Sequence, residues 1–217
     1  METPTVQERI IFIESPSAED LYAESSSGDR REGYALVSAL RLVGVPVEYS
    51  LVVNEDILVD RIIDLANRPL AMRRYVGGKL VSQDLYPPRV HIAAHGDKEG
   101  IRLTDGSLVR WSRLAEILDL FNQIKGYVGP EGKQRGMIQL HLSSCRGSDA
   151  KEMLQPNNPL LPVYALIGSE YEVSWSESLT AWIAYYHLSL AREYPAQEAL
   201  LVMNMAAGEN DLFKIYQ

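Results

Sequence analysis

The sequence predicts an α/β fold in three layers, in which a mostly parallel central sheet is covered by helices on both faces. Short apolar segments of strand length alternate with amphipathic segments of helical spacing along the 217 residues, as in proteins built around a parallel sheet. Gly and Pro residues stand between these segments, where turns and helix ends are expected. Because we find no internal repeat and no linker, we expect residues 1–217 to form a single domain.

The composition excludes several classes of function. A net charge of −8, without a stripe of Lys and Arg, argues against nucleic-acid binding. No apolar run approaches the ~18 residues of a membrane span, and the amino-terminal residues do not read as a signal peptide. Cys145 is the only cysteine, so no internal disulfide can form. A lone thiol suits a reducing compartment, and we expect a cytoplasmic protein.

The first third of the chain predicts two strands and the helix between them. Apolar runs indicate strands at 10–13 and 45–53, and the Ser-rich, acidic residues 15–29 are expected to form a loop. Apolar residues at helical spacing indicate a helix from Arg30, and Gly44 lies where its C-terminal cap belongs.

A second helix is expected to begin after Asn54, because this cap residue precedes two acids and an apolar stripe. Pro69 ends the stripe, and residues 69–88 give so little signal that we expect a connecting loop. The apolar run 90–94 is the third main strand.

The second half of the chain continues the alternation. Asp105 and Gly106 form a strong two-residue turn signal, so 101–109 predicts a β-hairpin. Apolar spacing then predicts a helix over 111–125, followed by a polar, Gly-rich loop. Further strands are expected at 137–142 and 163–168, and a loop after the first of them. Near the end, Ser174 and Glu177 form a capping box that opens a helix, and a last helix begins at Pro195.

Two of the predicted strands end at residues with reactive side chains, His95 and Cys145, which lie 50 residues apart. Ligands of parallel sheets bind beyond the carboxyl ends of the strands, so both side chains are expected at the binding edge. A thiol attacks a carbonyl as its thiolate, and an imidazole can remove the proton and later protonate the leaving amine. The amides of Gly96 and Cys145 are our candidates for the oxyanion hole.

These residues resemble the motifs of the caspase-like cysteine peptidases, in their bacterial CHAT-type branch. The caspase signature is Gln-Ala-Cys-[Arg/Gln/Gly]-Gly with a His ~50 residues upstream, and this chain has Ser143-Ser144-Cys145-Arg146-Gly147 after His95-Gly96. The first two signature positions differ, but Ser and a small residue before the Cys are normal in the CHAT-type branch. The resemblance covers about residues 88–207.

The resemblance implies a three-layer caspase-like fold and a cysteine endopeptidase without cofactor. His95 takes the place of the family's catalytic His, Cys145 that of its nucleophile, and Gly96 that of an oxyanion-hole amide. It also implies a specific protein substrate, a possible activating partner protein, and a regulated role in bacterial defence or cell death. The alternative is a catalytically silent peptide-binding module of the same fold.

A substrate pocket is expected beside the two catalytic residues, as the resemblance implies. Its candidates stand at the end of the first strand, after His95, before the Cys, and after the fifth strand: Glu14, Asp97, Ser143, Glu170 and Trp175. An acidic pocket would favour a basic residue before the scissile bond. Two alternatives remain open: the acids are solvated loop residues, or Tyr171 and Trp175 wall an apolar pocket.

Each of these residues also has a structural interpretation. A lone Cys is commonly a small buried hydrophobe, and a lone His on a strand is commonly a core residue. His91 and His141 each lie four residues before a motif residue and deeper in the sheet, so we expect both to be hydrogen-bonded core residues. A zinc site built from these histidines with His95 and Cys145 is conceivable, but the spacings match no structural site and we expect no metal.

Overall fold

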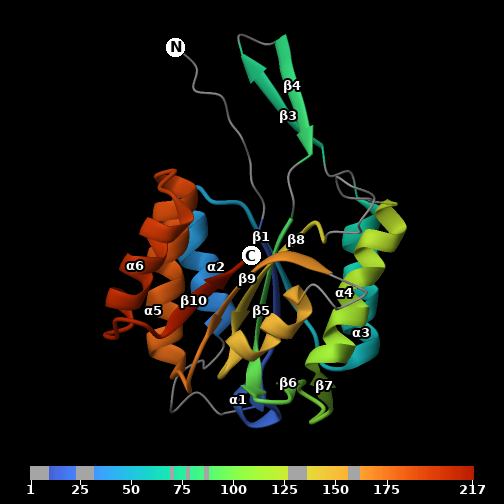
Figure 1. Cartoon of the computed structure of the whole chain (residues 1–217), viewed down its shortest axis with the longest axis vertical. Coiled ribbons are helices and arrows are strands. Elements are labelled where there is room, and N and C mark those ends of the chain that lie inside the picture. Colours follow the sequence, from blue (N-terminus) through green and yellow to red (C-terminus); the bar gives the residue numbers. More distant parts are fainter. Residues whose placement is uncertain are drawn as a thin grey trace.

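The middle layer is a twisted sheet. The computed structural model describes residues 10–22, 32–68, 71–76, 79–85, 88–126, 136–155 and 162–217. Within these ranges the sheet has eight strands (Figure 1). They are β1 (Ile10–Ser15), β2 (Val47–Leu51), β5 (Arg89–Asp97), β6 (Gly100–Arg102), β7 (Leu108–Arg110), β8 (Ile138–Ser143), β9 (Val163–Ser169) and β10 (Phe213–Tyr216).

The strand order is β10-β9-β8-β5-β1-β2, and β6 and β7 extend from the end of β5. The pairs β1–β2, β1–β5, β5–β8 and β8–β9 are parallel, whereas β10 runs antiparallel to β9 at the edge. The chain leaves β1 for β2 on one side and later returns to place β5 on its other side. Such a switch point opens a crevice at the carboxyl ends of the strands.

Helices cover both faces of the sheet (Figure 1). They are α1 (Ala18–Tyr22), α2 (Glu32–Leu42), α3 (Glu55–Asn67), α4 (Trp111–Lys125), α5 (Trp175–Tyr186) and α6 (Ala196–Ala206), with a 3-10 helix, η2 (Gly147–Leu154), and a π-helical turn, η3 (His187–Ala191). One apolar core joins α3 and α4 to the sheet, and a second joins α2, α5 and α6 to its other face. The predicted three-layer α/β class is therefore confirmed.

Several local predictions are confirmed in detail. The side chain of Asn54 caps α3 by accepting from the amide of Ile57 at 3.0 Å. Ser174 and Glu177 form the expected capping box of α5. The hairpin predicted over 101–109 is present, but its loop spans residues 103–107 and is longer than the expected two-residue turn; Gly106 has a φ of +84°, which Gly adopts without strain.

Other local predictions were wrong. Residues 69–88 contain a separate two-stranded sheet of β3 (Ala71–Val76) and β4 (Lys79–Leu85) in place of a plain connecting loop; the overlooked signal is the Gly77-Gly78 pair in the sequence. The predicted loop 15–29 contains α1, and the residues after Cys145 contain η2. Most of the expected Gly-rich loop, and residues 23–29, lie outside the described residues.

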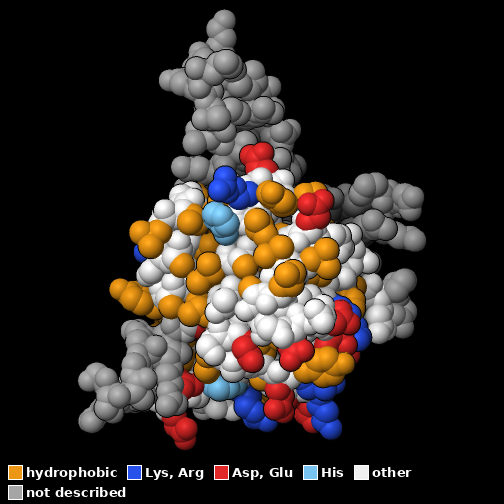
Figure 2. Space-filling view, turned by 90° about the vertical axis from the view of Figure 1, so that its left-hand side faces the viewer, with side chains coloured by type: hydrophobic (Ala, Val, Ile, Leu, Met, Phe, Trp, Pro, Cys, Tyr) orange, Lys and Arg blue, Asp and Glu red, His pale blue; other side chains and the backbone are white. Residues whose placement is uncertain are grey.

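The outer surface of α6 is apolar. Figure 2 shows apolar side chains spread over the face of the molecule on which α5 and α6 lie. On α6, Leu201, Val202 and Met205 are 64%, 40% and 72% exposed.

No helix in the described ranges is both long and apolar enough to cross a membrane.

Candidate active site

The pairing of two strands brings the segments that carry His95 and Cys145 together. In the parallel pair of β5 and β8, every partner lies 50 positions further along the chain, ending with Ala93 opposite Ser143. His95 and Cys145 have the same separation and each lies two residues beyond that last pair. Their segments also touch, because a Cβ on Gly96 would lie 2.7 Å from the carbonyl oxygen of Cys145. Only Gly fits this approach without a shift of the backbone.

Cys145 lies in a tight turn between β8 and η2. The amide of Gly147 donates to the carbonyl of Ser144 at 3.2 Å, and the hydroxyl of Ser169 donates to the same carbonyl at 2.7 Å. Arg146 has a φ of +56°, a conformation that is uncommon for a residue with a side chain and that concentrates at functional sites. The turn thus holds the Cys145 side chain at the end of β8.

The Cys145 thiol contacts the segment that follows β9. It donates to the carbonyl of Val173 at 3.6 Å and accepts from the amide of Val173 at 3.5 Å. The same segment is held against the turn, because the amide of Arg146 donates to the carbonyl of Tyr171 at 3.1 Å. The thiol is partly buried and reduced. In this structure the thiol therefore faces Val173.

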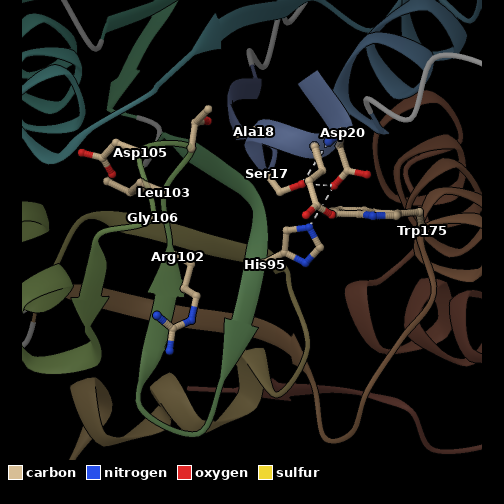
Figure 3. A pocket seen from close by; sticks show the side chains of 11 residues that line it. Ser17, Ala18, Asp20, His95, Arg102, Leu103, Asp105, Gly106 and Trp175 are labelled. Carbon is tan, nitrogen blue, oxygen red and sulfur yellow. Dashed lines mark hydrogen bonds and ion pairs between the residues drawn. The ribbon is translucent and has the colours of Figure 1, made fainter. Parts of the chain in front are cut away.

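His95 is paired with a carboxylate that was not predicted. Its Nε2 lies 3.0 Å from Oδ2 of Asp20, and the two side chains are 46% and 9% exposed (Figure 3). The ring also meets Trp175 edge to face, with centroids 5.2 Å apart. With Nε2 held by Asp20, Nδ1 is the nitrogen available for a thiol proton. Asp20 can therefore orient the imidazole as the carboxylate of a catalytic triad does.

Asp20 is positioned by the start of α1. The amide of Asp20 donates to the hydroxyl of Ser17 at 3.0 Å, and that hydroxyl donates to Oδ2 of Asp20 at 2.7 Å. The Ser-x-x-Asp spacing is a helix-start signature, and it is the signal that could have found this element in the sequence. Its contact with His95, 75 positions away, had no sequence signal.

A cavity of about 710 Å³ lies beside His95 (Figure 3). It is lined by residues 17–20 on one side, residues 102–106 of the β6–β7 hairpin on the other, and by His95 and Trp175. The two walls are joined, since the hydroxyl of Ser15 accepts from the amide of Thr104 at 3.0 Å. The hydroxyl of Thr104 in turn donates to the carbonyl of Pro16 at 2.7 Å.

Two of the five expected pocket residues are buried. Glu14 is 2% exposed, and its carboxylate accepts from the amide of Gly33 at 2.8 Å and the hydroxyl of Tyr49 at 2.6 Å. Ser143 is 1% exposed and donates to Glu32 at 2.6 Å. Both side chains bond to α2 or β2 beneath the site, so the expectation that they line an open pocket is corrected.

The other three expected pocket residues are closer to the surface. Asp97 lies on the hairpin side, where it accepts from the amide of Glu99 at 2.7 Å and pairs with Arg102 at 3.4 Å. Glu170 accepts from the hydroxyl of Tyr216 on β10. Of the five, Trp175 is the one that lines the cavity beside His95.

His91 and His141 are buried in the core, as the sequence predicted. Both are fully buried, and their Nδ1 atoms lie 2.8 Å and 2.6 Å from the hydroxyl of Tyr186. A hydroxyl can donate to one neutral imidazole and accept from the other. Burial lowers the pKa of His91 to about 3 and also lowers that of His141. Within the described ranges, no group of three His, Cys, Asp or Glu could hold a metal ion.

Glu32, at the start of α2, is a second buried group that was not predicted. It is 3% exposed, and its Oε1 accepts from the hydroxyls of Ser143 and Ser178 at 2.6 Å and 3.2 Å. Burial is the main cause that raises its pKa to about 8, and the nearby Glu14 adds to the effect. Glu32 is therefore a neutral carboxylic acid at pH 7, directly behind the turn that carries Cys145.

No family model matches this chain, and no curated protein matches it. Among solved structures, it is similar to the complex of Porphyromonas gingivalis RgpB pro- and mature domains, with a TM-score of 0.48 and 10% identity over 97% of this chain and 47% of that one. It is also similar to the Arg specific cysteine proteinase gingipain R, with a TM-score of 0.49 and 10% identity over 96% of this chain and 46% of that one. The chain thus spans about half the length of both.

Proposed function

We propose that this protein is a caspase-like cysteine peptidase that cleaves a partner protein with Cys145 as nucleophile and His95 as acid and base. The proposal rests on one observation. Residues that pair between β5 and β8 lie 50 positions apart in the sequence, and His95 and Cys145 are separated by the same 50 positions. A thiol and an imidazole carried by the ends of neighbouring strands can come close enough to exchange a proton, which is the first requirement of this chemistry.

The chemistry proceeds in two halves. His95 takes the thiol proton on Nδ1, and the thiolate forms a bond to the substrate carbonyl carbon. The tetrahedral oxyanion is held by backbone amides, for which Gly96 and Cys145 remain the candidates. As the C–N bond breaks, His95 gives its proton to the leaving amine. Water then adds to the thioester with His95 as base, and the acid product leaves as the thiol regains its proton.

The finer parts of the proposal rest on the motif around Cys145. The sequence Ser143-Ser144-Cys145-Arg146-Gly147 resembles the CHAT-type branch, so we propose a regulated role in bacterial defence or cell death. An activating partner protein would fit a resting thiol that contacts Val173. The single free cysteine suits a reducing cytoplasm.

The alkylation rate of Cys145 against pH tests the dyad without knowledge of the substrate. Iodoacetamide is added to the native chain and to His95→Ala, and loss of free thiol is followed by mass spectrometry. An activated thiol reacts with an apparent pKa well below the ~8.5 of free Cys, and its rate depends on His95. Since Cys145 is the only cysteine, the signal needs no deconvolution.

His187→Ala is the matched control, because it removes a histidine of η3 that lies apart from β5 and β8. It should alkylate like the native chain. A slow reaction with an ordinary pKa, unchanged in His95→Ala, would contradict the peptidase. The catalytically silent peptide-binding module would then be the better description.

A further inference from the structure

We propose that the cavity beside His95 holds the part of the substrate that follows the scissile bond, and that it selects a Lys or Arg side chain there. The inference rests on the proposed function, to which it adds a substrate class. The ligand of the cavity is the peptide half that carries the new amino terminus and leaves after cleavage.

The position of the cavity relative to the two catalytic residues decides which half of the substrate it holds. His95 forms part of its wall, whereas the Cys145 thiol lies outside it, against Val173. The acyl half of the substrate stays bonded to the thiol, and the amine half receives its proton from the imidazole. The cavity on the imidazole side is therefore the place for the leaving amine and the residues after it.

The walls of the cavity are fixed before any ligand arrives. Ser15 and Thr104 join the end of β1 to the hairpin through their hydroxyls, and the amide of Asp105 donates to the carbonyl of Val53 at 3.0 Å. Ser17 holds the opposite wall at the start of α1. A volume of about 710 Å³ lies within the range of ligand sites and is ample for a long side chain with its backbone.

Charge selects the class of side chain. Three acidic residues line the cavity, Glu19, Asp20 and Asp105, against one basic residue, Arg102. Arg102 already has a partner outside the lining, since it lies 3.4 Å from Asp97. Asp20 is engaged by His95, so Glu19 and Asp105 are the acids that would meet a ligand cation.

The Asp105 carboxylate is held ready for a cation. Its Oδ1 accepts from both the amide and the hydroxyl of Ser107, at 2.9 Å and 2.6 Å. These bonds lower the pKa of Asp105, so it is ionised at neutral pH. Trp175 supplies an apolar wall on which the methylenes of a Lys or Arg side chain can lie.

Cleavage of a proteome-derived peptide library tests this selection without a known substrate. The native chain, Glu19→Gln and Asp105→Asn digest the library, and mass spectrometry gives the residues on both sides of each cut. The native enzyme should favour Lys or Arg after the scissile bond, by roughly two- to fivefold per carboxylate as expected for partly exposed charge pairs. Each variant should lose part of that preference, whereas its preference for the residue before the scissile bond should stay unchanged.

The variants are chosen to keep the fold. An Asn at 105 can still accept from Ser107 and hold the turn, and Glu19 is exposed. Glu198→Gln, at an exposed position of α6, removes the same charge far along the chain and should leave both preferences unchanged. Cleavage without any preference for the residue after the scissile bond would overturn the inference, but it would still support the proposed peptidase activity.

A binding experiment separates the two proposals if no peptide is cut, an outcome that would count against the peptidase itself. The tripeptide amides Lys-Ala-Ala, Ala-Ala-Ala and Glu-Ala-Ala imitate the released half of a substrate and share the same free amine. They are titrated against the native chain, and binding is followed by the change in tryptophan fluorescence, because Trp175 lines the cavity whereas Trp111 and Trp182 are buried elsewhere. The Lys peptide should bind several-fold more tightly than the Ala peptide, and Asp105→Asn should reduce the difference. Equal affinities would overturn the inference.

Discussion

The buried carboxyl group of Glu32 makes stability depend on pH in an unusual direction. Its pKa is raised from 4.5 to about 8, chiefly by burial. Between these two values the unfolded chain has lost the proton while the folded chain keeps it. The unfolded state therefore binds fewer protons, and stability falls as pH rises through this window.

The buried histidines act in the opposite direction at lower pH. Burial lowers the pKa of His91 from 6.5 to about 3, and that of His141 moves the same way. Between 3 and 6.5 the unfolded chain binds protons that the folded chain refuses, so stability rises with pH there. Above 6.5 the histidine effect fades over about one pH unit while the Glu32 effect persists, so these three groups place the stability maximum near pH 6.5.

The size of the fall follows from the width of the window. One group that holds a proton in the folded state alone changes the unfolding free energy by about 1.4 kcal/mol per pH unit. From pH 6.5 to pH 8, where Glu32 is half ionised in the fold, its stabilising contribution falls by about 1.5 kcal/mol.

Glu32→Gln tests this reasoning, because an amide imitates the neutral acid and keeps an acceptor for Ser143 and Ser178. Unfolding in urea is followed by circular dichroism at pH 6.5, 7 and 8. Over this range the native chain should lose about 1.5 kcal/mol relative to the variant, which lacks the ionisable group. The control Glu116→Gln neutralises an exposed acid of α4 and should follow the native chain. Parallel curves for the native chain and Glu32→Gln would refute the assignment of a buried neutral acid.

Three further substitutions test the site and its support. Gly96→Ala places a Cβ 2.7 Å from the carbonyl of Cys145, so it should destabilise the fold by about 1–3 kcal/mol in urea unfolding and slow alkylation of the thiol. Asp20→Asn should lower the His95-dependent alkylation rate roughly 10- to 100-fold, because the imidazole loses the carboxylate that orients it, while stability stays close to native. Tyr186→Phe leaves two buried imidazoles without their shared hydroxyl, and it should cost about 1–3 kcal/mol in urea unfolding.

The sequence predicted most elements of the main sheet because their signals are local. The Asn54 cap, the turn at Asp105-Gly106 and the capping box at Ser174 each lie within a few residues of what they organise. The hairpin of β3 and β4 was missed, although Gly77-Gly78 carries a turn signal of the same kind. There we gave the weak pattern of 69–88 more weight than the two glycines.

The surroundings of the site were not predictable, because they depend on contacts between distant segments. Asp20 meets His95 across 75 positions, and Glu32 meets Ser143 across 111. Glu14 was expected at an open pocket because the resembling families build theirs near the end of the first strand, but it is buried against α2 and β2. Which acids stay exposed depends on how the helices pack, and apolar spacing does not carry that information.

The alignment of His95 with Cys145 depends on the register of β5 and β8, and the buried histidines help to fix that register. A slip of one residue would turn every side chain of a strand to the other face. His91 lies directly opposite His141 in this pair, and both rings meet the hydroxyl of Tyr186. A slipped strand would break one of these bonds in a fully buried place, where an unmet polar group is costly. Because each catalytic candidate follows its buried histidine by four residues, the register that satisfies the histidines also brings together the chain segments that carry His95 and Cys145.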